Sequence, residues 1–278
     1  MTYRTDLALE SLAAASGRGR ITEAHRGTEF SVTEITIPDD DAGRSLGKGK
    51  GRYITLEGQS LSRFSDRYEA MALELAGELR PLLPASGCVL VAGLGNTDIT
   101  PDALGPRTSA HVLATRHLHD ALGEEEAFLR SLRPVAVLAG GVLGQTGMES
   151  AELIRAAADA IHPAAVIAVD ALACTSLSRL GTTIQISDAG IAPGSGVANH
   201  RTALDTASFG IPVIGIGVPT VIGMRDLTGR APLPRTADMM VTPRDIDRLI
   251  SQAAHLLGCG INLALHPQLD YADVEAFQ

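Results

Sequence analysis

The chain has 278 residues, of which 45% are hydrophobic and 20% are charged, with 29 glycines and no tryptophan. This apolar content excludes a chain that is disordered throughout, and the absence of any run of about eighteen apolar residues excludes an evident transmembrane helix. The formal net charge of −9 argues against nucleic acid as the main partner, because binding to phosphate needs a basic face.

Residues 1–60 are polar and interrupted by glycine and proline, and we expect them to form an extension that packs on a core at residues 86–265. Within this extension, residues 43–52 predict an exposed loop and residues 53–57 predict a short strand. Apolar residues then recur near helical spacing over residues 65–83, which predicts a helix.

Four short, wholly apolar runs follow. They lie at residues 88–92, 134–139, 164–169 and 211–216, and helical patterns occur at 106–119, 147–161 and 243–257. Strands that are apolar throughout are typical of a parallel sheet with both faces covered. Residues 182–188 alternate between polar and apolar, which predicts an edge or antiparallel strand. The sequence therefore predicts a single α/β domain over residues 1–278, with a doubly wound, mostly parallel sheet and helices on both faces.

Two aspartates follow strands of this predicted sheet. Asp102 lies in the loop after the first apolar run, and Asp170 directly follows the third. Ligands of such sheets bind beyond the carboxyl ends of the strands, so the two carboxyl groups could converge there. A close carboxyl pair shares one proton and supplies the base and the acid that water attack on an amide needs. The structural alternatives are a helix N-cap for Asp102 and a strand-end turn for Asp170.

Glycine-rich loops accompany these aspartates at residues 140–147 and 190–201. Their backbone N–H groups could stabilise an oxyanion and hold a substrate strand. The candidates in the substrate and oxyanion loops are Gly95, Asn96, Gln145, Ser195, Asn199 and Arg201. For Ser195, which lies between two glycines, a turn residue is a better interpretation than a nucleophile.

The three cysteines, Cys88, Cys174 and Cys259, lie far apart, and none belongs to a C-x-x-C motif. This pattern is typical of a reducing compartment and favours neither a disulfide framework nor a zinc site. The amino-terminal residues show no basic stretch leading into an apolar one, so we expect no secretory signal and a cytoplasmic location.

Distinctive short stretches occur in order along almost the whole chain. Among them are Arg4–Glu10, Gly51–Glu57, Gly93–Asn96, Thr100–Pro106 (TPDALGP), Asp170–Ala173 and Thr182–Asp188 (TTIQISD). Through these stretches the chain resembles the germination proteases of spore-forming bacteria, the endopeptidases that degrade small acid-soluble spore proteins.

This resemblance implies an atypical aspartic-type endopeptidase with a fold similar to that of the hydrogenase-maturation proteases. The two essential aspartates of the family match Asp102 and Asp170. The resemblance further implies a homotetramer without metal or organic cofactor, located in the forespore or spore core. Its substrates would be small acid-soluble spore proteins, and we expect no direct binding to nucleic acid or to a membrane.

Two other functions stay open. A metal-dependent peptidase could use Asp102 and Asp170 together with a histidine such as His117 or His200. A non-proteolytic protein of the same fold could bind a spore protein or a small ligand at the same loops.

Overall fold

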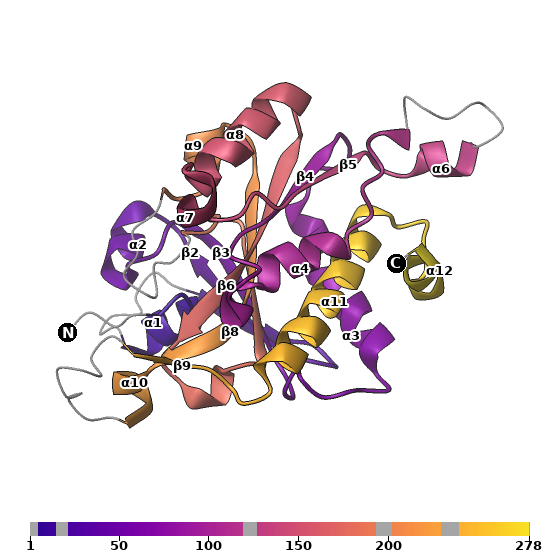
Figure 1. Ribbon diagram of the computed structural model, residues 1–278. Coiled ribbons are helices and arrows are strands. Elements are labelled where there is room, and N and C mark those ends of the chain that lie inside the picture. Colours follow the sequence, from indigo (N-terminus) through magenta and orange to yellow (C-terminus); the bar gives the residue numbers. More distant parts are fainter. Residues whose placement is uncertain (1–4, 15–21, 119–126, 193–201, 229–238, 278) are drawn as a thin grey trace.

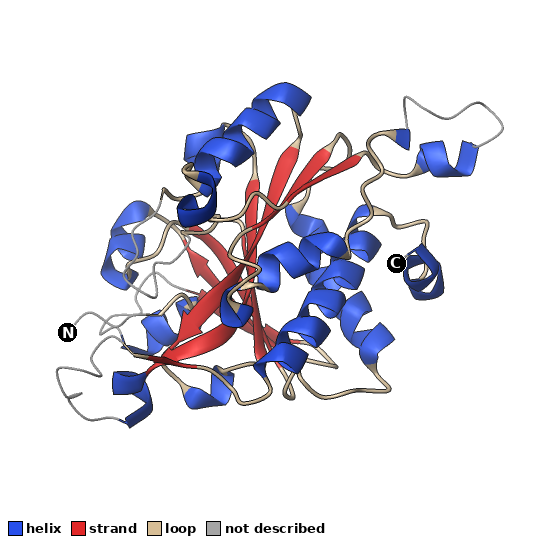
Figure 2. Ribbon diagram, in the orientation of Figure 1, coloured by secondary structure: helices blue, strands red, loops and turns tan. Residues whose placement is uncertain are grey.

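The computed structural model describes residues 5–14, 22–118, 127–192, 202–228 and 239–277. Within these ranges the chain forms one nine-stranded sheet in the order β1-β2-β3-β7-β8-β6-β4-β5, with β9 paired to β8. Figures 1 and 2 show that this sheet is twisted and has helices on both sides. None of the helices in the described ranges is both long and apolar enough to cross a lipid bilayer.

Four parallel strands form the part of the sheet that the apolar runs predict. They are β5 (Val135–Leu138), β4 (Val89–Gly93), β6 (Ala165–Cys174) and β8 (Val213–Gly223). The expected α/β fold with a parallel core is thus confirmed. However, β6 and β8 continue well beyond the predicted ends, because they pair with each other as far as Cys174 and Ile222.

The other strands extend the sheet in antiparallel fashion. They are β7 (Thr183–Ser187), β3 (Gly51–Glu57), β2 (Ser31–Ile37), β1 (Thr22–Arg26) and the short β9 (Met240–Val241). Of the two alternatives predicted for β7, the antiparallel strand is confirmed, and the edge strand is excluded because β7 lies between β3 and β8. Its polar side chains are buried, and one of them lies against the amino-terminal segment, where the Gln185 Oε1 accepts the Ala8 N–H at 2.7 Å.

Helices cover both faces of the parallel core (Figure 1). One face is covered by α3 (Tyr68–Leu79), α4 (Leu104–Ala110) and α11 (Ile246–Leu265). The other face is covered by α8 (Ser150–Ile161) and α9 (Thr206–Phe209). The remaining α-helices of the described ranges are α1 (Ala8–Ala14), α2 (Asp40–Leu46), α6 (Ala127–Ser131), α7 (Leu143–Thr146), α10 (Met224–Thr228) and α12 (Tyr271–Phe277).

The helix predicted over residues 106–119 ends at Ala110 in the structure. The buried Asn262 of α11 explains this end, because its side-chain Nδ2 donates to the His111 carbonyl at 2.8 Å. Its Oδ1 accepts the Leu113 N–H at 3.0 Å. A side chain from a distant helix thus supplies hydrogen bonds that the next helical turn would have made.

The predicted exposed loop at residues 43–52 is also partly wrong. It contains the end of α2 and the start of β3. Asp39 caps α2 by accepting the Ala42 N–H at 2.9 Å, and Gly47 ends it in the left-handed conformation.

Candidate active site

The parallel sheet has a step at its carboxyl end. β4 ends at Gly93, and the Leu94 N–H makes a last contact with the Val169 carbonyl at 2.8 Å, while β6 continues to Cys174. A short 3₁₀ turn, η2 (Thr100–Asp102), lies beside β6 and β8 at this step. Asp170 therefore lies inside β6, opposite Gly217 of β8, rather than at the end of a strand as the sequence predicted.

The turn that carries Asp102 is held against the strand that carries Asp170. A Cβ atom on Gly105 would lie 2.3 Å from the carbonyl oxygens of Leu94 and Val169, so the first turn of α4 packs directly on the strand ends. On the other side, the Thr220 hydroxyl of β8 donates to the Pro101 carbonyl at 2.8 Å. The two aspartates thus come from neighbouring segments at the same end of the sheet.

Asp102 is partly buried and is bound by the loop that follows β4. The Asn96 N–H donates to the Asp102 Oδ2 at 2.8 Å and lies 3.1 Å from its backbone carbonyl. Asp170 is 4% exposed, and its Oδ1 accepts the Ala171 N–H at 2.9 Å. Backbone N–H groups favour the ionised carboxylate, so each aspartate has a donor that can support negative charge.

Gln145 connects a second loop to this site. From α7 its Nε2 donates to the Asn96 Oδ1 at 2.8 Å and to the Asp98 Oδ2 at 3.0 Å. Gly95, Asn96 and Gln145 are thus gathered around Asp102, together with Asp98, which no sequence pattern indicated as a site residue. The spacing between residues 98 and 145 carries no signal of this contact, which depends on β4 and β5 being neighbours.

The other sequence candidates lie elsewhere. Ser195, Asn199, Arg201 and His200 fall outside the described residues. His117 follows Arg116, whose N–H donates to the carbonyl of Val135, the first residue of β5, at 3.0 Å. It therefore lies at the amino end of the parallel strands, away from the step, and this removes His117 from the metal-dependent alternative.

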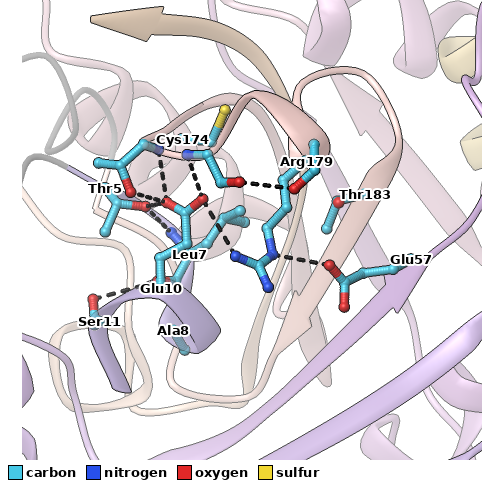
Figure 3. A network of polar contacts seen from close by, with 12 residues as sticks. Thr5, Leu7, Ala8, Glu10, Ser11, Glu57, Cys174, Arg179 and Thr183 are labelled. Atoms are coloured by element: carbon cyan, nitrogen blue, oxygen red, sulfur yellow. Dashed lines mark hydrogen bonds and ion pairs between the residues drawn. The ribbon is translucent and has the colours of Figure 1, made fainter. Parts of the chain in front are cut away.

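A buried carboxylate network lies at the far end of β6, four residues beyond Asp170 (Figure 3). Glu10 of α1 points into the loop after Cys174 and accepts the N–H groups of Thr175 and Ser176 at 2.7 and 2.9 Å. Its other partners are the hydroxyls of Thr5 and Thr175 and, at 3.7 Å, the Nη1 of Arg179.

Residues 5–8 continue this attachment along β6. Asp6 exchanges two hydrogen bonds with the backbone of Ala173, at 3.0 and 2.8 Å. The half-buried Lys48 donates from Nζ to the Thr5 and Asp6 carbonyls at 3.1 and 2.8 Å, and desolvation lowers the pKa of this amine. The sequence signal for this network is the Arg4–Glu10 stretch that carried the family resemblance, but its structural role could not be inferred from it.

In the comparison with known proteins, the family model and the most similar relatives carry the same description. A family model described as "Germination protease" matches residues 12–231. Proteins named "Germination protease" from Caldanaerobacter subterraneus and Clostridium tetani are 37% and 35% identical, over 96% and 100% of this chain and 95% and 99% of theirs. Among solved structures, a [NiFe] hydrogenase maturation protease HycI from Thermococcus kodakarensis matches 68% of this chain and 98% of its own, with 19% identity and a TM-score of 0.40.

Proposed function

Because this chain belongs to the germination protease family, we propose that it is an endopeptidase that cleaves small acid-soluble spore proteins with Asp102 and Asp170 as its catalytic pair. The observation that supports this pair most strongly is the step in the sheet. The pairing of β4 with β6 ends at Gly93, and beyond this point η2, which ends in Asp102, lies beside β6 instead.

The proposed reaction is a direct attack of water on the peptide bond. One aspartate, as the carboxylate, removes a proton from water, and the other, in its protonated form, polarises the carbonyl or protonates the departing amine. Neither role is assigned to one residue, because coupled carboxyl groups titrate as a pair. Backbone N–H groups of the glycine-rich loops would stabilise the oxyanion.

Gln145 is the proposed orienting residue of this site. Its contacts with Asn96 and Asp98 fix the loop whose Asn96 N–H binds Asp102. Through this chain of hydrogen bonds, Gln145 would hold the Asp102 carboxylate in one orientation without touching it. Such support is what a carboxylate needs to meet water in one defined geometry.

The remaining parts of the proposal concern the setting of the reaction. We propose a homotetramer in the cytoplasm of the forespore or in the spore core, without direct binding to nucleic acid or a membrane. The family membership supports this setting, and the net charge of −9 supports the absence of a nucleic-acid partner.

The proposal is tested by a gel time course with a purified small acid-soluble spore protein. The wild type is compared with Asp102→Asn, Asp170→Asn and, as a matched control, Asp159→Asn at an exposed position on α8. We expect discrete cleavage products in the presence of a chelator, a rate at least about 100-fold lower in either site variant, and no change in the control.

Other outcomes would contradict specific parts of this proposal. Full activity in one site variant would exclude that aspartate from the catalytic pair. Prompt loss of cleavage on adding chelator would favour a metal-dependent peptidase. A folded wild type that binds the spore protein but does not cut it would favour the binding function.

A further inference from the structure

Three side chains with different donor atoms meet between α11 and α12, outside the candidate active site. His255 and Cys259 are four residues apart on α11 and therefore share one face of the helix. Glu275 approaches them from α12. The Glu275 Oε1 lies 2.9 Å from the His255 Nε2 and 3.3 Å from the Cys259 Sγ, and Sγ lies 3.7 Å from Nε2.

The two separations that involve sulfur are close to the edges of a metal coordination polyhedron, whereas the 2.9 Å between nitrogen and oxygen is a hydrogen-bond length that would increase by about 0.4 Å around an ion. With bonds of about 2.0–2.1 Å to nitrogen and oxygen and about 2.3 Å to sulfur, a tetrahedral zinc ion places such donors roughly 3.4–3.6 Å apart. One sulfur, one imidazole nitrogen and one carboxylate oxygen form a donor set that suits zinc. Among the described residues, this is the group of three in which each member can offer one ligand atom within 4.8 Å of the others.

The surroundings of this group hold its members in place. The ring of Tyr68 stacks on His255 at a centroid distance of 5.4 Å, and the ring of His111 meets it edge-on at 5.1 Å. Cys259 is fully buried, and Val274 anchors α12 in the core beside Glu275. Metal ligands are held in this way by a packed supporting shell, which fixes the imidazole plane before the ion binds.

We propose that His255, Cys259 and Glu275 bind one divalent transition-metal ion of the zinc type, which fastens α12 to α11. On binding, the Cys259 thiol releases its proton to solvent, and the imidazole carries its proton on Nδ1 so that Nε2 can donate a lone pair. The carboxylate turns from hydrogen-bond acceptor to ligand. With three protein ligands, a water molecule takes the fourth position.

The site is tested by titrating the purified, metal-stripped full chain with Co²⁺ and recording its absorption spectrum. The variants are Cys259→Ser, His255→Gln and Glu275→Gln, and the matched control is Cys88→Ser, which changes a half-buried free cysteine elsewhere. We expect one Co²⁺ per chain, a thiolate charge-transfer band and displacement by Zn²⁺. We further expect loss of the band in Cys259→Ser, affinity at least about 100-fold lower in the other two site variants, and no change in Cys88→Ser.

Hydrogen exchange provides a second readout that does not depend on a variant folding correctly. Zn²⁺ should slow the exchange of the α12 backbone amides in the wild type, and a chelator should reverse this effect. A folded wild type without a thiolate band would overturn the proposal, and so would a band that is lost in Cys88→Ser but kept in Cys259→Ser. Unchanged exchange in α12 on adding Zn²⁺ would overturn the fastening role.

Discussion

Gly95 is the residue on which the position of Asp102 depends most directly. Its φ of +114° lies in a region that favours glycine, and a Cβ atom there would lie only 1.9 Å from the Asp102 backbone oxygen. A side chain would therefore both strain the loop and push the 3₁₀ turn away from β6. Glycine is therefore required at position 95 both by the backbone conformation and by the lack of space for a side chain.

We predict that Gly95→Ala lowers the free energy of unfolding by about 1–3 kcal/mol and the cleavage rate by at least about 10-fold. The matched control is Gly77→Ala in α3, where a Cβ atom would meet nothing within 4 Å beyond the adjoining residues and backbone of its own helix. The control should stabilise the protein by about 0.5–1 kcal/mol, because alanine favours the helix. Urea denaturation and the gel assay measure these effects, and full activity in Gly95→Ala would show that Gly95 does not determine the position of Asp102.

His266 gives the protein a predictable response to acid. It is fully buried, and burial lowers the pKa of its imidazole from 6.5 to about 4. Within the described part of the chain, neither ring nitrogen has a hydrogen-bond partner. The unfolded chain binds this proton more readily than the folded one, so the contribution to stability is present above pH 6.5 and is lost as the pH falls towards 4.

From this residue alone, we predict a loss of roughly 2–3 kcal/mol in the free energy of unfolding between pH 7 and pH 4.5. The change His266→Leu should remove that part of the pH dependence, because leucine does not titrate. Urea denaturation of both proteins at the two pH values measures the difference. Equal pH dependence in wild type and variant would show that His266 is not the titrating group.

At the scale of elements, the attachment of α1 to the end of β6 is the clearest structural link between the amino-terminal segment and the candidate site. Glu10 is 6% exposed and accepts hydrogen bonds from the Thr5 hydroxyl and from the backbone N–H groups of Thr175 and Ser176. Arg179 lies between Glu10 and Glu57, so the network also reaches β3 (Figure 3). Replacing one member of such a buried network lowers the free energy of unfolding, because its partners stay buried without their hydrogen bonds.

We predict that Glu10→Gln lowers the free energy of unfolding by about 2–4 kcal/mol, because the amide brings an N–H₂ group among hydrogen-bond donors. The amides of Thr175 and Ser176 should exchange faster in this variant. Glu69→Gln, at an exposed position in the first turn of α3, is the control and should cost less than about 0.5 kcal/mol. A loss in Glu10→Gln no larger than in the control would contradict the role given to the network.

The elements also show where sequence patterns were sufficient and where they were not. The four apolar runs predicted the parallel strands, because burial on both faces leaves a direct mark on the sequence. The helical pattern at residues 243–257 missed the last two turns of α11, where Gly258 and Gly260 interrupt it. A Cβ atom on Gly258 would lie 2.4 Å from the His111 side chain, and one on Gly260 would lie 2.5 Å from the Leu75 side chain. These glycines therefore permit close packing and do not end the helix.

Partners that are distant in the chain account for the remaining differences. The end of α4 depends on Asn262, and the contact of Gln145 with Asn96 depends on strand order. The alternation in β7 left an edge strand open, but β3 pairs with it, and the amino-terminal segment contacts the buried Gln185. Local spacing carries no information about these contacts.

At the scale of the whole molecule, the proposed tetramer gives a direct prediction. Light scattering of the purified protein at assay concentration should give a mass of about four times the 29.0 kDa of one chain. A mass equal to that of one chain would exclude the tetramer and leave the chemistry of the site untouched.

The order of strands in the sheet also has a consequence for the protein during its synthesis. β3 is complete at Glu57, but Glu57 pairs with Thr183 of β7, which leaves the ribosome 126 residues later. At ordinary elongation rates this gap corresponds to about 6 to 25 seconds. A sheet of β1, β2 and β3 that forms during that time has an edge without its partner strand, and such edges pair readily with other chains. Nascent chains on one messenger RNA should therefore be most prone to aggregate before the second half of the chain has emerged.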